Sequence, residues 1–198
     1  MSLRRLHHEQ PASFAFNAEN KARVEKEIAK YPPGRQATAV IAALWIGQEQ
    51  EGWVTKPMIE EVARLLDMPF IRVLEVATFY TMFHLEPMGE HHVQVCTTTP
   101  CWLRGSDDIV KACRKHIHDK PHTVSSDGKF SWEEAECLGA CVNAPMIQIG
   151  ADTYEDLTGE KAAEIIEALR RGEQPATGSQ TGRTSSEPAP TVLKEPVR

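Results

Sequence analysis

The chain has 198 residues, of which 41% are hydrophobic and 25% are charged, and its formal net charge is -6 at pH 7. This length allows one large domain or two small domains and a tail. A mildly acidic chain without a basic stripe offers no electrostatic surface for nucleic acid or anionic lipid, so we exclude both as partners. No apolar run approaches the length that crosses a bilayer, and we expect no direct membrane insertion.

The first sixteen residues are polar and charged, with Arg4, Arg5, His7 and His8 among them. They contain no apolar segment of the kind that directs export. Residues 1–16 are therefore expected to form an N-terminal extension, and the cysteines of the chain are expected to stay reduced.

Residues 17–90 predict a small bundle of four short amphipathic helices. Asn17 and Thr55 are placed to cap the first and third helices, a second helix is expected from about residue 36 to 51, and Pro69 opens the fourth. Residues 75–83 are apolar nearly all round, which predicts burial on more than one side of the fourth helix. The covering surface is either the second domain of this chain or another subunit.

Residues 91–172 predict a second domain with the order strand, helix, strand, strand, helix. The strand that begins it ends at Cys96, and a helix follows from near Ser106. Further strands are expected near residues 122–125, 129–132 and 146–149, and Thr158 caps the last helix. The order is close to a thioredoxin-like arrangement. The expected fold class is therefore α+β, an N-terminal helical bundle followed by a thioredoxin-like α/β domain with a small mixed sheet.

The last segment, residues 173–198, is rich in Pro, Ser, Thr, Gly and Gln. Such a composition buries too little apolar surface to offset the entropy of ordering the chain. We expect a disordered tail, with docking along a partner as the alternative.

Four of the five cysteines form two spaced pairs, Cys96 with Cys101 and Cys137 with Cys141. A 2Fe-2S cluster uses four thiolates, two on each iron, so the pairs predict such a cluster with one pair on each iron. Structural zinc is an alternative, although its pairs are usually separated by two residues. Disulfides are a weaker alternative, because nothing marks the chain as exported. The remaining Cys113 is expected in the core as a small hydrophobic residue.

The surroundings of the second pair predict how an electron would be held. Gly139 allows the left-handed turn that such a tight loop requires. Glu133, Glu134 and Glu136 precede the pair, and anions oppose reduction of a negatively charged cluster. We therefore expect a low reduction potential, unless the three carboxylates are only a solvated strand end. The Thr97–99 run and the loop amides are expected to donate hydrogen bonds to sulfur.

Three further features accompany the first cysteine pair: Cys137-Leu138-Gly139-Ala140-Cys141, the following Asn143-Ala144-Pro145, and residues 77–83 upstream. Through them residues 14–171 resemble the family of thioredoxin-like 2Fe-2S subunits of respiratory complex I, the E subunits of bacterial NADH:quinone oxidoreductase. The resemblance implies that Cys96, Cys101, Cys137 and Cys141 bind one 2Fe-2S cluster per chain.

The same resemblance implies a place in a complex. The expected partners are the flavoprotein subunit that binds NADH and FMN, and the large iron-sulfur subunit of complex I. The expected location is cytoplasmic and peripheral, on the cytoplasmic side of the inner membrane through the complex. This chain has no G-x-G-x-x-G turn, so neither nucleotide is expected on it, and no substrate chemistry is expected from the isolated chain. The alternative is the equivalent diaphorase subunit of an NAD-dependent hydrogenase or formate dehydrogenase.

Overall fold

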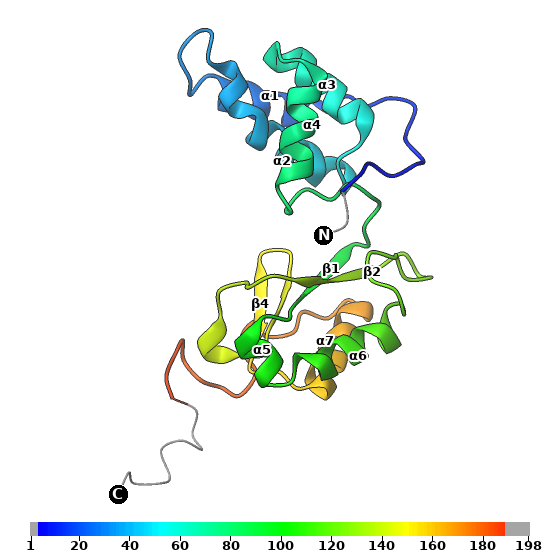
Figure 1. Cartoon of the computed structure of the whole chain (residues 1–198), viewed down its shortest axis with the longest axis vertical. Coiled ribbons are helices and arrows are strands. Elements are labelled where there is room, and N and C mark those ends of the chain that lie inside the picture. Colours follow the sequence, from blue (N-terminus) through cyan, green and yellow to red (C-terminus); the bar gives the residue numbers. More distant parts are fainter. Residues whose placement is uncertain (1–3, 189–198) are drawn as a thin grey trace, which may run out of the picture. The chain divides into compact units, whose positions relative to one another are not determined.

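The computed structural model describes residues 4–188, and these fall into two compact units that divide between Met88 and Gly89. The first unit is helical and the second contains a sheet with helices (Figure 1). None of the helices within residues 4–188 combines the length and the apolar character that a bilayer crossing requires.

The first unit contains the helices that the sequence predicts, with small differences at their ends: α1 (Ala18–Ile28), η1 (Gln36–Ala39), α2 (Val40–Glu51), α3 (Lys56–Leu66) and α4 (Phe70–Phe79). The Asn17 side chain accepts a hydrogen bond from the Asn20 amide, and Thr55 accepts one from the Met58 amide. Both predicted N-caps are therefore confirmed. The second helix differs from the prediction in opening with a 3-10 turn, η1.

The core of this unit is formed by apolar side chains that recur at helical spacing, including Val24, Leu44, Met58, Val62, Leu66 and Val73. Ala77 and Phe83 are fully buried, and the other apolar residues of 75–83 are those for which the sequence predicts a covering surface beyond the helical bundle. The Phe79 side chain is 76% exposed in this chain, and Tyr80 and Met82 are also exposed. The end of α4 therefore carries apolar surface that its own helical unit leaves uncovered.

The N-terminal segment, predicted as a separate extension, contacts the helical unit. The Arg4 guanidinium donates hydrogen bonds to the carbonyl oxygens of Thr78 (3.2 Å), Tyr80 (2.6 Å) and Phe83, and the His7 amide donates to Leu85 O (2.9 Å). Carbonyl groups at a helix end lack partners within the helix, so an arginine can bind there. These contacts join distant residues through loops, and no periodic pattern in the sequence announces them.

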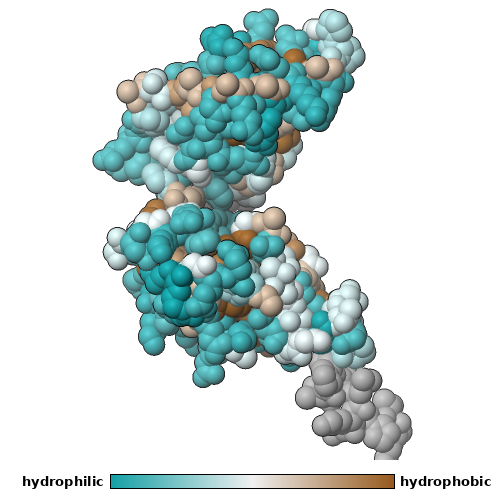
Figure 2. Space-filling model, turned by 180° about the vertical axis from the view of Figure 1, so that it is seen from behind, coloured by the Kyte–Doolittle hydropathy of each residue, from teal (hydrophilic) through white to brown (hydrophobic). Residues whose placement is uncertain are grey.

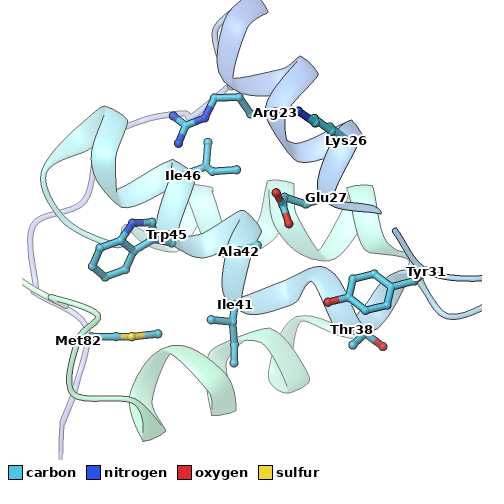
Figure 3. Close-up of a pocket in the computed structure, with 10 residues that line it drawn as sticks. All are labelled: Arg23, Lys26, Glu27, Tyr31, Thr38, Ile41, Ala42, Trp45, Ile46 and Met82. Atoms are coloured by element: carbon cyan, nitrogen blue, oxygen red, sulfur yellow. The ribbon is translucent and has the colours of Figure 1, made fainter. Parts of the chain in front are cut away.

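A groove of about 700 Å³ lies on the surface of the helical unit (Figure 3). Apolar Trp45 and Met82 lie in its wall, with Tyr31 further along, and charged residues of α1 such as Arg23 and Glu27 border it. None of the cysteines lines this groove.

The second unit contains β1 (His91–Cys96), α5 (Thr99–Leu103), α6 (Ser106–His116), β2 (Phe130–Ala135), η2 (Cys141–Asn143), β3 (Ile147–Ile149), β4 (Asp152–Glu155), α7 (Gly159–Arg170) and β5 (Gly178–Ser179). The strands form one sheet in the order β2-β1-β3-β4-β5. β1 pairs with β2 in parallel and with β3 antiparallel, and β3 with β4 is antiparallel. The predicted α+β class with a small mixed sheet is confirmed.

Helices α6 and α7 lie side by side (Figure 1), and their apolar faces share one core with the sheet. Val93 and Val95 of β1 are fully buried, whereas the intervening Gln94 is half-buried, which is the alternation of a strand with one face in the core. Cys113 on α6 is fully buried in this core, as predicted.

Several local predictions for this unit are wrong, and the strand β4 was not predicted, since a helix was expected from near Tyr154. Residues 122–125 form no strand, although the His122 and Ser125 amides donate to Trp132 O (2.8 Å) and Phe130 O (2.8 Å) across the turn that Asp127 closes before β2. The short helix α5 was not predicted, since five residues are too few to show helical periodicity.

The tail prediction is wrong for the part of residues 173–198 that the structure describes. β5 pairs in parallel with β4, and the Arg183 guanidinium pairs with the Asp156 carboxylate. These bonds are polar, so a composition argument based on apolar burial does not detect them. Residues 189–198 lie outside the described residues.

The close approach of Gly89 to β2 gives a testable prediction. A Cβ at this position would lie 2.3 Å from the Phe130 carbonyl carbon, which is backbone and cannot yield without disturbing β2. We expect Gly89→Ala to lower the free energy of unfolding by about 3 kcal/mol. Denaturant unfolding followed by circular dichroism measures this loss.

The matched control is Gly150→Ala in the same unit. Gly150 has φ +61°, and a methyl group added there would meet nothing within 4 Å, so the variant carries only backbone strain of about 1 kcal/mol. Equal losses in the two variants would contradict the steric explanation.

Candidate metal centre

The first cysteine pair lies where β1 meets α5. Cys96 is the last residue of β1, and its amide donates to Met146 O (3.3 Å). Thr98 then precedes α5 as its N-cap, and the first turn of this helix carries Cys101. Both cysteines are only 1% exposed, so this pair is buried at the carboxyl end of a strand that is hydrogen-bonded on both sides.

The second pair lies on the loop that follows β2. Cys137 and Cys141 are both exposed, and their Sγ atoms are 3.3 Å apart. Gly139 between them has φ +93°, a left-handed conformation that disfavours any residue with a Cβ. The predicted role of this glycine in the turn is confirmed, and the loop holds the two sulfur atoms on the same side.

The two pairs converge through shared hydrogen-bond donors. The Thr98 hydroxyl lies 3.3 Å from Cys96 Sγ and also donates toward the Cys137 sulfur. Backbone amides add further donors, from Leu138 to Cys96, from Met146 to Cys101, and from Gly139 to Cys137. Of the expected threonine donors, Thr98 lies at hydrogen-bond distance from a sulfur atom, and the loop amides of Leu138 and Gly139 lower the pKa values of Cys96 and Cys137. A sulfur atom that receives such bonds is stabilised as a thiolate.

The thiol pKa values differ within each pair. Burial opposes ionisation of Cys96, but hydrogen bonds from Thr98 and Leu138 outweigh it and lower the pKa of this thiol below its usual value. Burial, together with the hydrogen bond to Cys96, raises the pKa of Cys101 to about 12.

The exposed pair repeats this division. The amide of Gly139, followed by the hydrogen bond from Cys141, lowers the pKa of Cys137, and the same thiol–thiol contact, followed by burial, raises the pKa of Cys141. In each pair, one thiol has a lowered pKa and ionises readily. Its negative charge then disfavours ionisation of the second thiol. A bound cation would favour the thiolate form of both cysteines in each pair.

This donor set fits a 2Fe-2S cluster. Two adjacent pairs of thiols, each able to bind one iron, are what such a cluster requires, and soft thiolate ligands favour iron-sulfur chemistry. Within residues 4–188, no three His, Cys, Asp or Glu side chains are arranged to hold a single metal ion together.

The site differs strongly in exposure from one pair to the other. Cys96 and Cys101 belong to a small apolar cluster with Ala144 and Met146. Around the exposed pair, apolar side chains reach the surface: Trp102 is 58%, Val142 67% and Leu103 70% exposed. Figure 2 shows one face of the molecule as mainly hydrophilic with scattered apolar patches.

A negative charge is held on β2 close to the first pair. Burial alone would raise the pKa of Glu133, but hydrogen bonds from His92 and Gln94 lower it to about 2. Glu133 precedes by two residues the Ala135 that pairs with Cys96, which places it about 7 Å along the strand from that partner. Glu134 and Glu136 are exposed.

The structure brings the two predicted thiols of each pair into contact and places Thr98 between the pairs, and Cys113 lies apart in the core of the sheet and α6. Burial raises the pKa of Cys113 to about 12, which suits a core thiol. The feature that the sequence did not predict is the approach of the C-terminal segment, in which the Arg183 guanidinium and the Ser185 carbonyl oxygen contact residues directly after Cys141. No local sequence pattern around Arg183 predicts this contact.

Comparisons with known proteins agree with these observations. The profile of the thioredoxin-like 2Fe-2S ferredoxin family matches residues 24–170. The chain is 54% identical to the NADH-quinone oxidoreductase E subunit 1 of Rhizobium meliloti over 95% of this chain and 70% of that protein. It is also 54% identical to the NADH-quinone oxidoreductase E subunit of Rickettsia bellii, over 80% of this chain and 95% of that protein.

Among solved structures, the chain is similar in fold to an NAD+-reducing NiFe-hydrogenase in the H2-reduced state. The TM-score is 0.59 at 16% sequence identity, over 69% of this chain and 23% of the hydrogenase chain. The matched region is thus a small part of that longer protein.

Substitution of the cysteines tests the ligand set. Cys137→Ser and Cys141→Ser should abolish or distort the visible absorption of a bound 2Fe-2S cluster, because serine oxygen replaces one thiolate. Cys113→Ser should leave the absorption unchanged, since this thiol lies in the core with α6. The measurement is the visible spectrum, with iron and sulfide contents, of anaerobically prepared variants. Loss of the spectrum in Cys113→Ser would show that the ligands are wrongly assigned.

Proposed function

The chain belongs to the thioredoxin-like 2Fe-2S ferredoxin family, and we propose that it serves as the electron-transferring E subunit of an NADH-quinone oxidoreductase, with its cluster on Cys96, Cys101, Cys137 and Cys141. The observation that carries this proposal is the convergence of two thiol pairs around shared hydrogen-bond donors. Bound there, a 2Fe-2S cluster accepts and returns one electron.

The residues of the chain set the conditions for that electron. Four thiolates supply the ligands, while the amides of Leu138, Gly139 and Met146 donate hydrogen bonds that offset part of the negative charge. The ionised Glu133 acts in the opposite direction, since a nearby anion disfavours added negative charge. The chain thus acts as a one-electron carrier within an oxidoreductase.

The proposed partners are the flavoprotein subunit, which would bind NADH and FMN, and the large iron-sulfur subunit of the complex. The exposed apolar side chains support a fixed assembly: Phe79 and Tyr80 at the end of α4, and Trp102, Leu103 and Val142 beside the cysteines. Exposed aromatic and aliphatic groups of this size typically mark protein interfaces. Through this assembly the chain would lie on the cytoplasmic side of the inner membrane, as a peripheral subunit.

The second candidate is the equivalent subunit of an NAD-dependent hydrogenase or formate dehydrogenase. The similarity to the NAD+-reducing NiFe-hydrogenase favours it, but at 16% identity that similarity concerns the fold alone. The 54% identity to two proteins named as E subunits of NADH-quinone oxidoreductase supports the first candidate more strongly.

Redox titration tests the electron-carrier function. We expect the purified chain to take up one electron per two irons at a low potential. Paramagnetic resonance at each applied potential monitors this reduction. Glu133→Gln should move the midpoint upward, because it removes a charge that opposes reduction while keeping a side chain of similar size. A strongly positive midpoint in the unmodified chain, or a downward movement in the variant, would contradict the electrostatic account.

Native mass spectrometry of the complex tests the partners. We expect membrane-arm subunits of a quinone-reducing complex, whereas a nickel or molybdenum subunit would support the second candidate. Phe79→Ser should weaken retention of the chain in the complex, because it removes an exposed aromatic side chain from the proposed interface. Arg64→Ser, an exposed position on α3, is the control and should be retained normally. Equal retention of the two variants would remove Phe79 from the interface.

A further inference from the structure

The chain continues beyond α7 and returns to the sheet. β5 pairs with β4 so that Gly178 lies opposite Tyr154 and Ser179 opposite Glu155, and the Gln180 amide then donates to Glu155 O (3.0 Å). This segment lies outside residues 24–170, which the family profile matches. It is therefore an addition to the domain that carries the cysteines, and its contacts need their own explanation.

The segment is anchored on Asp156, directly after β4. The Asp156 carboxylate accepts hydrogen bonds from the Ser179 hydroxyl (2.6 Å) and from Arg183 Nε (2.9 Å) and Nη2. The side chains of Arg183 and Asp156 are only 6% and 9% exposed. A guanidinium bound through two nitrogen atoms and shielded from water has a well-defined orientation.

The anchored arginine reaches the loop of the second cysteine pair. Arg183 Nη2 donates to the Val142 carbonyl oxygen (3.2 Å), one residue after Cys141. The next residue is held as well, because Asn143 Nδ2 donates to Ser185 O (2.8 Å) and to Glu155 Oε2 (2.6 Å). Both residues of η2 after Cys141 are thus bound to the returning segment or to the strand beside it.

These bonds lie where the loop needs support. Cys137 and Cys141 are exposed, Gly139 between them gives the backbone extra freedom, and Val142 is 67% exposed. A hollow of about 440 Å³ lies beside the loop, with Leu138 and Gly139 on one side and Ser185 and Ser186 on the other. The returning segment therefore forms one wall of the space next to the exposed thiols.

We propose that Arg183, anchored by Asp156, is a positioning residue that holds η2 so that Cys141 Sγ stays beside Cys137 Sγ and both remain fixed on their iron. This inference rests on the proposed cluster site. Because the charges of Arg183 and Asp156 offset each other, the contribution of Arg183 is the geometry of its hydrogen bonds rather than its charge.

The test uses the full chain, prepared anaerobically with its cluster, in the variants Arg183→Gln, Arg183→Lys and Arg171→Gln. The readouts are the rate of iron release to an added chelator and the paramagnetic resonance spectrum after reduction by dithionite. Arg171→Gln is the matched control, because Arg171 forms an exposed ion pair with Glu173 at the end of α7.

We expect Arg183→Gln to release iron about tenfold faster than the unmodified chain, since it loses charge-assisted bonds that hold the loop. Its resonance spectrum should change, because the loosened pair alters the surroundings of one iron. Arg183→Lys should release iron at an intermediate rate. Its single ammonium group keeps the positive charge, but it cannot bind Asp156 through two nitrogen atoms and also reach Val142 O. Arg171→Gln should match the unmodified chain.

Unchanged release and spectrum in Arg183→Gln would overturn the proposal, as would full restoration by lysine, which would assign the effect to charge. A chain truncated after Gly182 keeps β5 but lacks Arg183 and Ser185, and it should release iron at least as fast as Arg183→Gln. Thermal unfolding of each variant separates the local effect from general loss of stability, and faster release that only follows a lower melting temperature would also overturn the proposal. An unmodified chain without any cluster would instead refute the proposed function itself.

Discussion

The meeting of four cysteine thiols is the constraint on which the second unit depends. Thiolates repel one another, so the chain must supply donors and geometry that tolerate them until a cation is bound. Cys96 lies at the end of a strand paired on both sides, and Cys101 follows within the first turn of α5. Thr98 then links the buried pair to the exposed one. The sheet thus fixes the position of the buried pair, and Thr98 connects the exposed pair to it.

The two pairs differ in a way that suits an electron carrier. Cys96 and Cys101 are packed among apolar side chains, which restrict water and weaken dielectric screening around their sulfur atoms. Cys137 and Cys141 face the surface, next to apolar Trp102 and Val142. A partner subunit that covered this surface would exclude water from the exposed pair and shorten the path of the electron. The buried pair is shielded from water, whereas the exposed pair can be reached by a partner.

Much of this arrangement could be predicted from the sequence, because its signals are local. Asn17 and Thr55 predict the starts of two helices. Val93 and Val95 predict a half-buried strand, and Gly139 predicts a left-handed turn. The features that escaped prediction depend on residues far apart in the chain, such as the Arg183–Asp156 pair, or on elements too short to show a period, such as α5. For Phe79 the sequence predicts a cover but cannot identify it, since apolar character predicts burial without saying which molecule provides the cover.

The electrostatics of the site follow from a balance between two sets of groups. Amides and the Thr98 hydroxyl donate to sulfur and favour the added electron, whereas the ionised Glu133 opposes it. The amides act directly on the sulfur atoms and stabilise their negative charge, whereas the carboxylate acts from a position two residues along β2 from the partner of Cys96. Burial of Glu133 disfavours its ionised form, and the hydrogen bonds from His92 and Gln94 more than offset this unfavourable desolvation. Glu133 lies on β2, the strand that leads to the second pair. A carboxylate stabilised in this way remains charged throughout the neutral pH range, so its opposition to reduction is constant there.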